Sequence, residues 1–246
     1  MSNTSKTPLE KYLFAPSNSH ARESIINHKL LFDLKIAAAE RGYFLNTYLP
    51  EVDQDGFDII FDDHDLVVKT QIKTVMAGAR TLRWRIKKRI LRPDLDMIEK
   101  LGFEPSPYGE GVGGGVILIQ INTNKEFNVK YFYTDVLILC GFRDNLLNVM
   151  RPPSTKVIRN FFRELLRGVG SEKIELPKSL FLEAYSAMAL LGLMGLHNNL
   201  STGIWRHHLM NLAEPRVPTN DLPAPVEKLI EHINEELANL SPRIKK

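Results

Sequence analysis

The chain has 246 residues, of which 32 are lysine or arginine and 29 are aspartate or glutamate, so its formal net charge is +3. Hydrophobic residues make up 43% of the sequence and charged residues 25%, which is typical of a globular protein and excludes a disordered or collagen-like chain. Cys140 is the single cysteine, which excludes an internal disulfide and a cysteine zinc site and favours a reducing compartment. We therefore expect a cytoplasmic protein.

The first structural element that the sequence predicts is a long helix. Residues 1–18 are expected to be flexible, and apolar residues then recur at helical spacing from Ser19, a typical N-cap, to Gly42, a typical helix end. Later in the chain the most apolar stretch, Leu180–Leu196, is short and contains Glu183, so no membrane segment is expected.

Three runs of strand-forming residues follow the helix, at Tyr43–Leu49, Phe57–Phe61 and Leu66–Val75. The last two are separated by four polar residues, which is a length typical of a hairpin loop. If Phe61 faces Leu66 across this loop, Asp58 lies opposite Lys69. Because side chains alternate along a strand, the polar ones then share one face of the hairpin and the apolar ones share the other. The polar face contains Asp58, Lys69, Gln71 and Lys73.

The middle of the chain predicts one more helix and two more strands. The helix is expected at Pro93–Gly102, and the strands at Val116–Asn122 and Val129–Phe132. The glycine-rich segment 111–115 lacks the Gly-Lys-Ser/Thr ending of a nucleotide-binding loop, so we expect a tight loop before the strand at Val116 and no nucleotide cofactor.

Beyond residue 150 the sequence shows helical periodicity and almost no strand pattern, at Thr155–Arg167, Leu180–Asn199 and Pro225–Leu240. The predicted organisation is a flexible segment at 1–18, an α/β core with a mixed sheet flanked by helices at 19–150, and a helical region at 151–246.

The polar face of the predicted hairpin has a chemical use. The Asp58 carboxylate, the Gln71 amide oxygen and the Ile72 carbonyl are hard oxygen ligands of the kind that Mg²⁺ prefers. Metal-bound water is acidified, and Lys73 can orient such a water and stabilise charge that develops on a phosphate. This set of groups is suited to phosphodiester hydrolysis.

Gly56-Phe57-Asp58 followed by Gln71-Ile72-Lys73 resembles the motif of the PD-(D/E)XK nuclease superfamily, which includes type II restriction enzymes, Mrr-like nucleases and Holliday-junction resolvases. The resemblance covers about Lys29 to Asn122. It implies a restriction-endonuclease-like fold, Mg²⁺ and DNA cleavage. Two features depart from the pattern: the proline–aspartate pair is missing, since Pro50 is not next to Asp58, and Gln71 replaces the usual acid, as it does in the Mrr-like branch.

In that family an acid from the first helix often completes the metal site. The predicted helix offers Asp33 and Glu40, which are seven residues apart and so share a face, and Glu23 near its start. We favour Asp33 as a metal ligand and Glu40 as a catalytic acid without ranking them. Glu51 or Asp55, just before the predicted strand that carries Asp58, could serve instead.

A basic block follows the second hairpin strand and contains no acid. Its cations are Arg80, Arg83, Arg85, Lys87, Lys88, Arg89 and Arg92. We expect these side chains to contact the DNA backbone, because lysine and arginine neutralise phosphates without sequence preference. The alternative is an ordinary amphipathic strand in which Leu82, Trp84, Ile86 and Ile90 pack inward.

The sequence thus favours a Mg²⁺-dependent endonuclease of the type II restriction kind that acts on double-stranded DNA. A homodimer is expected, because cutting both strands with one site per chain requires two sites related by a two-fold axis. Region 151–246 could serve DNA recognition, dimerisation or both. Three alternatives stay open: a structure-specific repair or recombination nuclease, a catalytically inactive DNA-binding protein of the same fold, and a purely structural interaction protein.

Overall fold

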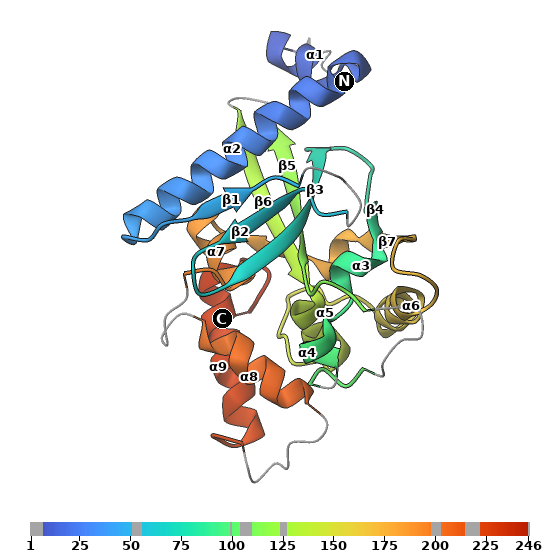
Figure 1. Cartoon of the computed structure of the whole chain (residues 1–246), viewed down its shortest axis with the longest axis vertical. Helices are drawn as coiled ribbons and strands as arrows, with labels where there is room; N and C mark the ends of the chain where they lie inside the picture. The colour runs from blue at the N-terminus through green and yellow to red at the C-terminus, as the bar shows by residue number, and fades with distance from the viewer. Residues whose placement is uncertain are drawn as a thin grey trace.

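The computed structural model describes residues 7–50, 56–98, 100–103, 110–123, 127–197, 203–214 and 222–245. Within these residues a six-stranded mixed sheet, in the order β1-β2-β3-β5-β6-β8, forms the centre of the molecule (Figure 1). The predicted α/β class, with a mixed sheet flanked by helices, is confirmed. The strands are β1 (Asn46–Tyr48), β2 (Ile59–Asp62), β3 (Val67–Met76), β5 (Gly115–Asn122), β6 (Asn128–Asp135) and β8 (Leu182–Ala184).

Strand directions follow from the lengths of the connections. β1, β2 and β3 are antiparallel neighbours joined by short segments, whereas β3 and β5 are parallel and are joined by a long crossover. That crossover contains β4 (Arg83–Lys87), α3 (Lys88–Leu91) and α4 (Leu95–Ile98), so the helix predicted at Pro93–Gly102 is shorter than expected. β4 leaves the main sheet and pairs antiparallel with β7 (Lys173–Pro177).

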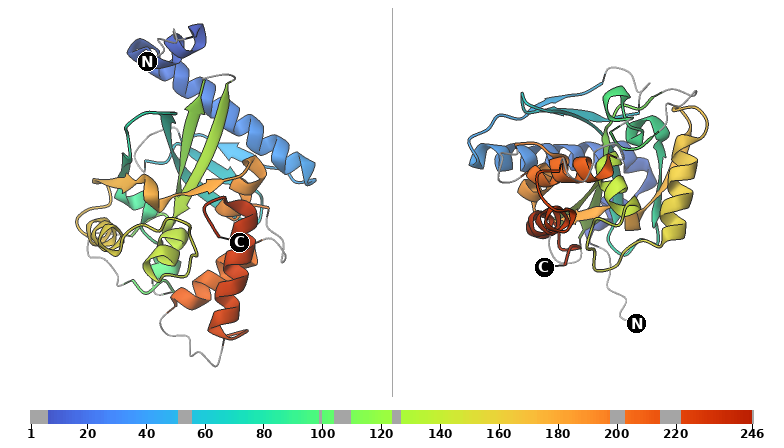
Figure 2. Two further views of the ribbon diagram at one scale, coloured as in Figure 1. Left: turned by 180° about the vertical axis from the view of Figure 1, so that it is seen from behind. Right: turned by 90° about the horizontal axis from the view of Figure 1, so that it is seen from below.

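The helix α2 (Ser19–Glu40) and the helix α7 (Ala187–Met194) contact one another and lie on the same side of the sheet (Figure 2). α2 buries Leu30, Leu34 and Ala37 there. Residues 8–18, within the segment predicted to be flexible, form α1 (Pro8–Phe14) and η1 (Pro16–Asn18), and residues 1–6 lie outside the described part of the chain.

The β2–β3 hairpin is confirmed, but its predicted register is wrong by two residues. Phe61 pairs with Val68 rather than with Leu66. The loop keeps four residues but runs from 63 to 66 instead of from 62 to 65, and the Asp63 Oδ1 stabilises it there by accepting the N–H groups of Asp65 at 3.1 Å and Leu66 at 2.7 Å. A shift of two residues leaves every side chain on its predicted face.

The apolar face of the hairpin is also confirmed. Its side chains are buried under α2 and contribute to the core: Ile59, Phe61, Val68, Thr70 and Ile72. The Thr70 hydroxyl, which has no access to solvent, donates to the Ile59 carbonyl at 3.1 Å. Burial on this side therefore leaves the opposite face of β2 and β3 for polar side chains.

Region 151–246 is not helical throughout, which corrects the prediction. β8 pairs with β6 at the edge of the main sheet, and β7 pairs with β4. The stretch predicted as one helix, Leu180–Asn199, instead holds η2 (Lys178–Leu180), β8 and α7. The Ser186 hydroxyl accepts the Ala189 N–H at 3.2 Å and starts α7 there. Buried residues on both sides of position 150 form one hydrophobic cluster.

The remaining helices lie beyond β6. They are α5 (Val136–Arg143), α6 (Thr155–Leu166), α8 (Ile204–Ala213) and α9 (Val226–Leu240). α9 packs on α8 with Leu229, Ile233 and Leu237 buried. Among the described helices, none has the length and apolar character needed to cross a membrane.

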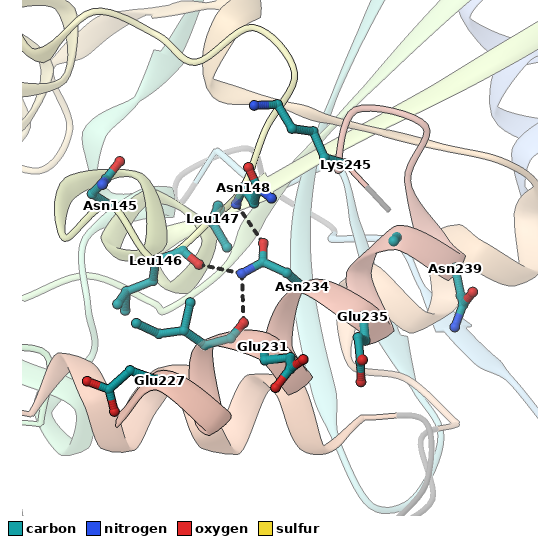
Figure 3. A pocket seen from close by; sticks show the side chains of 12 residues that line it. Asn145, Leu146, Leu147, Asn148, Glu227, Glu231, Asn234, Glu235, Asn239 and Lys245 are labelled. Atoms are coloured by element: carbon teal, nitrogen blue, oxygen red, sulfur yellow. Dashed lines mark hydrogen bonds between the residues drawn. The ribbon is translucent and has the colours of Figure 1, made fainter. Parts of the chain in front are cut away.

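The Asn234 side chain hydrogen-bonds α9 to the loop that follows α5. Its side chain accepts the Asn148 N–H at 2.6 Å and donates to the Leu146 carbonyl at 2.9 Å (Figure 3). A hollow of about 870 Å³ lies beside this contact, and Glu227, Glu231 and Glu235 line it. Carboxylates along this side of α9 make it unsuited to binding a polyanion.

Candidate active site

Asp58 lies at the point where β2 separates from β3. Its backbone N–H donates to the Thr70 carbonyl at 2.7 Å, and its carboxylate Oδ2 accepts the Ile72 N–H at 2.6 Å. The carboxylate thus takes the place that a backbone carbonyl would occupy if the ladder continued. Extended by one residue beyond Ile59, the observed register sets Asp58 opposite Gln71 rather than opposite Lys69, the residue that was predicted.

Gln71 is buried, with 7% of its surface exposed. Its Oε1 accepts the Lys87 N–H at 3.4 Å, so the end of β4 crosses over this face of β3. The Lys87 side chain lies against Gly56, where φ is +82° and where a Cβ would approach Lys87 Cδ to 2.3 Å. Gly56 is therefore required both by its backbone conformation and by this contact.

Lys73 is two residues beyond Gln71 on β3, and its side chain is partly exposed on the same face. It makes no hydrogen bond or ion pair with any residue in the described part of the chain. Its ammonium group can therefore reach a ligand without first breaking an internal ion pair.

The predicted helix acids lie on the wrong face of the sheet. The Asp33 carboxylate pairs with Lys29 at 2.5 Å and accepts the Tyr131 hydroxyl at 2.5 Å. Tyr131 shares a face with Thr74, the neighbour of Lys73, because both pair with Ile119. Since adjacent residues of a strand point to opposite faces, Asp33 is separated from Lys73 by the sheet itself.

The other acids that were considered do not complete the site either. Glu40 is exposed and lines the same hollow as Asp33 and Tyr131, and Glu23 is exposed near the start of α2. Glu51 and Asp55 lie outside the described residues. The predictions that Asp33 is a metal ligand and Glu40 a catalytic acid are therefore not supported by the geometry.

The oxygen donors that remain fit Mg²⁺ in kind. They are the Asp58 carboxylate, the Gln71 amide and the Ile72 carbonyl, all hard ligands on one strand pair. The Ile72 N–H points to Asp58, and a strand residue directs its N–H and its carbonyl to the same side, so the Ile72 carbonyl also faces β2. Mg²⁺ keeps several waters, which suits so small a set.

Some cationic side chains of the basic block are exposed to solvent, and others face the protein interior. On β4, Trp84 and Ile86 are buried while Arg83 and Arg85 are exposed, and Arg80 and Arg89 are exposed as well. The inward packing predicted for Trp84, Ile86 and Ile90 is confirmed, whereas Leu82 is 65% exposed.

Lys88 and Arg92, predicted to bind DNA, instead face the interior. Lys88 donates to the Arg167 carbonyl and pairs with Glu172 at 2.6 Å. Arg92, only 2% exposed, donates to the carbonyls of Leu165, Arg167 and Gly168 at 2.6–2.9 Å. Both side chains hold the loop that joins α6 to β7, so neither is available to a phosphate.

Substitution of Arg92 by methionine is expected to lower the free energy of unfolding by about 2–4 kcal/mol, because the carbonyls of Leu165 and Gly168 lose the donor that Arg92 supplies, while Lys88 still donates to the carbonyl of Arg167. Arg85→Met, which removes the same charge from an exposed position, is expected to change it by less than about 0.5 kcal/mol. Urea denaturation of both variants measures the difference. Equal stability of the two variants would contradict the structural role of Arg92.

The glycine-rich segment is a loop that leads into β5, as predicted. The Gly111 N–H donates to the Pro93 carbonyl at 2.9 Å, and a Cβ at Gly111 would lie 1.9 Å from the Arg92 carbonyl oxygen. The segment therefore packs against the chain around Arg92, where only glycine fits.

Two histidines and the single cysteine are buried in the interior and take no part in the candidate site. Burial raises the pKa of the Cys140 thiol to about 12, so this cysteine is not a nucleophile at neutral pH. Burial also lowers the pKa of His197, and burial with the nearby His232 lowers the pKa of His208. A lowered pKa favours the neutral form of both histidines in the folded protein at neutral pH.

Acidification below pH 6.5 is expected to destabilise the fold. Histidines whose pKa is lower in the folded chain bind more protons when unfolded, so stability rises with pH in this window and is lost as pH falls. Burial raises the pKa of Glu236, so the stability that this carboxyl contributes decreases as pH rises. This effect is opposite to that of the histidines and occurs at a more acidic pH.

Urea denaturation between pH 7.5 and 5.5 measures this effect. His208→Gln is expected to reduce the slope by at most about 1.4 kcal/mol per pH unit, the value for one proton. A slope that His208→Gln leaves unchanged would show that this histidine does not carry the effect.

Comparison with known proteins found no matching family model, no similar curated protein and no similar solved structure.

Proposed function

We propose that the chain is a Mg²⁺-dependent endonuclease that hydrolyses phosphodiester bonds in double-stranded DNA, most like a type II restriction enzyme. The observation that supports this most is the placement of Asp58, Gln71 and Lys73 at the open end of the β2–β3 pair. The exposed arginines of β4 border the same face, because the Lys87 N–H contacts Gln71. A polyanionic substrate is suited to such a surface.

The proposed roles follow from the chemistry of each group. Asp58, Gln71 and the Ile72 carbonyl would hold Mg²⁺, which when bound stabilises negative charge on a phosphate and acidifies water. The Lys73 ammonium orients the attacking water and stabilises charge on the phosphate oxygens. Arg83, Arg85 and Arg89, together with Arg80, contact the DNA backbone and fix its position without reading its sequence.

A homodimer is part of this proposal. Each chain supplies one Lys73, and cleavage of both strands of a duplex requires two such sites related by a two-fold axis. Sedimentation on duplex DNA is expected to show two chains per duplex, and a monomer that cuts both strands would contradict the dimer.

Incubation with supercoiled plasmid and with phage DNA tests the activity. Discrete fragments are expected in Mg²⁺ and none in EDTA, because removal of the metal removes its charge stabilisation. Nicking or smearing in place of discrete bands would favour a repair, recombination or nonspecific nuclease. Absence of any cleavage would overturn the endonuclease proposal.

A catalytically inactive DNA-binding protein of the same fold is the second candidate. Within the described ranges, no three carboxylate, imidazole or thiol groups come together to hold a metal ion, and the Gln71 oxygen already accepts the Lys87 N–H. Thermal melting with Mg²⁺ separates the two functions. An endonuclease is expected to melt at a higher temperature in Mg²⁺ in a way that depends on Asp58, whereas an inactive binder is not.

A further inference from the structure

A second polar hollow, of about 300 Å³, lies where β5 and β6 meet the segment that follows β7. Gln120 of β5 and Lys130 of β6 are paired across the sheet at its floor. Lys178, at the start of η2, lines it together with Arg151 and Arg243. Four cations from four separate parts of the chain thus converge on one small space.

The charges around this hollow do not balance. Glu183 is the single acid that lines it, and this carboxylate pairs with Lys130 at 2.8 Å. Arg151, Lys178 and Arg243 form no ion pair with a carboxylate in the described part of the chain, so the formal charge of the lining is +3. Convergent cations that outnumber their counter-charges are the arrangement that binds an anion.

Two of the cations are held rigidly. Lys178 Nζ donates to Gln120 Oε1 at 2.6 Å and lies 4.6 Å from the centre of the Phe132 ring. That bond occupies one of its three hydrogens and leaves two for a ligand. Arg243 donates to the backbone carbonyls of Arg151 and Ser179, both at 3.2 Å, and to that of Phe181. These contacts fix the positions of both charges before any ligand arrives.

Burial disfavours the charged forms of two of these cations. Burial lowers the pKa of Lys178, as do the charges of Lys130 and Arg243, and Glu183 offsets this only in part. Burial likewise lowers the pKa of Arg243. A bound anion would reverse this effect, because an opposite charge favours the protonated forms.

The hollow opens on the same face of the sheet as Lys73. Gln120 pairs with Val75, two residues beyond Lys73, so the two side chains share a face. Strand geometry separates their Cα atoms by about 8 Å. The Lys178 N–H donates to the Leu82 carbonyl at 2.9 Å, so the end of β4 that carries exposed Arg83 borders the hollow.

We propose that this cationic pocket, formed by Lys130, Arg151, Lys178 and Arg243, binds a phosphate group of a nucleic-acid backbone. Its volume holds one phosphate, and its cations continue the row of arginines on β4. The choice of nucleic acid rests on the proposed function, whereas the phosphate chemistry rests on the pocket alone. The pocket positions DNA on the face that carries Lys73.

Fluorescence anisotropy with a labelled 30-base-pair duplex in EDTA tests the proposal. Lys178→Gln retains a hydrogen-bonding group for Gln120, and Arg151→Gln retains the carbonyl that Arg243 contacts. Each variant is expected to bind about tenfold more weakly at 0.1 M salt, with a salt-dependence slope smaller by about 0.9 for each phosphate that it no longer neutralises. Lys228→Gln, an equal charge change at an exposed site on α9, is the control and is expected to bind like the wild type.

Inorganic phosphate distinguishes a nucleic-acid phosphate from a free one. Compared with chloride at equal ionic strength, it is expected to raise the melting temperature of the wild type and of Lys228→Gln, but not that of Lys178→Gln. If phosphate stabilises the wild type while both pocket variants bind the duplex like the control, the ligand is a free phosphate and the nucleic-acid assignment is overturned. If phosphate has no effect and both variants bind like the control, the pocket is not a phosphate site.

The assay in EDTA also separates this proposal from the proposed catalytic function. It measures binding without cleavage, so a protein that fails to cut plasmid can still show weaker binding when Lys178 or Arg151 is replaced. In that outcome the endonuclease is overturned and the phosphate pocket is supported. If the wild type cuts plasmid, and Lys178→Gln and Arg151→Gln both bind the duplex as tightly as the wild type, the phosphate pocket is overturned and the endonuclease proposal is not.

Discussion

Lys73→Ala is expected to lower the rate of plasmid cleavage by about 10²–10⁴-fold, the range for loss of a group that stabilises transition-state charge or positions a proton. The variant is expected to fold, because Lys73 is partly exposed and makes no hydrogen bond or ion pair with a described residue. Duplex binding in EDTA is expected to change by only a few-fold, since one backbone cation is removed.

Lys69→Ala is the matched control for this experiment. Lys69 lies on the same face of β3, four residues before Lys73, and its ammonium group lies 5.9 Å from the centre of the Phe57 ring. Initial rates with supercoiled plasmid in Mg²⁺ are expected to separate the two variants by at least about a hundredfold. Cleavage by folded Lys73→Ala at the wild-type rate would show that Lys73 has no part in the chemistry.

Arg206→Leu is expected to lower the free energy of unfolding by about 3–5 kcal/mol, the cost of leaving one member of a buried ion pair without its partner. Arg206 pairs with Asp135 at 2.6 Å, and Asp135 is 2% exposed. The Tyr133 hydroxyl, whose pKa burial and then Asp135 raise well above its usual value, also donates to that carboxylate. Loss of Arg206 therefore leaves a buried negative charge in an apolar interior.

The substitution Asp135→Asn separates the effect of the buried charge from the effect of lost packing. Asp135 Oδ1 also accepts the Ile138 N–H at 2.8 Å and so caps α5, a role that asparagine retains. Arg206→Leu combined with Asp135→Asn is expected to be more stable than Arg206→Leu alone, because no buried charge remains. Urea denaturation measures the free energy of unfolding of the wild type, the two single variants and the double variant, with the exposed substitution Arg159→Leu as control. A double variant as unstable as the single one would show that packing, rather than charge, carries the effect.

Local sequence pattern was enough to predict which side chains of the hairpin share a face. Alternation along a strand depends only on local backbone geometry, so Gln71 and Lys73 lie on the same, polar face of β3 even though the predicted register was wrong by two residues, whereas the Asp58 carboxylate turns toward the Ile72 N–H. The same alternation predicted that Trp84 and Ile86 are buried and that Arg83 and Arg85 are exposed.

Long-range packing, in contrast, set where the helix acids and two of the basic residues lie. Periodicity placed Asp33 and Glu40 on one side of α2, but the face of the sheet that α2 covers follows from tertiary contacts, and it is the face opposite Lys73. Lys88 and Arg92 cannot be told from the exposed Arg89 by residue type. They turn inward because the carbonyls at the end of α6 and in the loop after it lie beside them.

The strands β7 and β8 also depended on partners distant in the chain. β8 has three residues and precedes a helical stretch, so its own sequence carries little strand signal, and it forms by pairing with β6 some 50 residues earlier. The cationic pocket arises in the same way, because Lys130, Arg151, Lys178 and Arg243 are widely spaced in the sequence. Local patterns fix the direction of a side chain relative to its own strand or helix, whereas which groups meet is set by the packing of elements against one another.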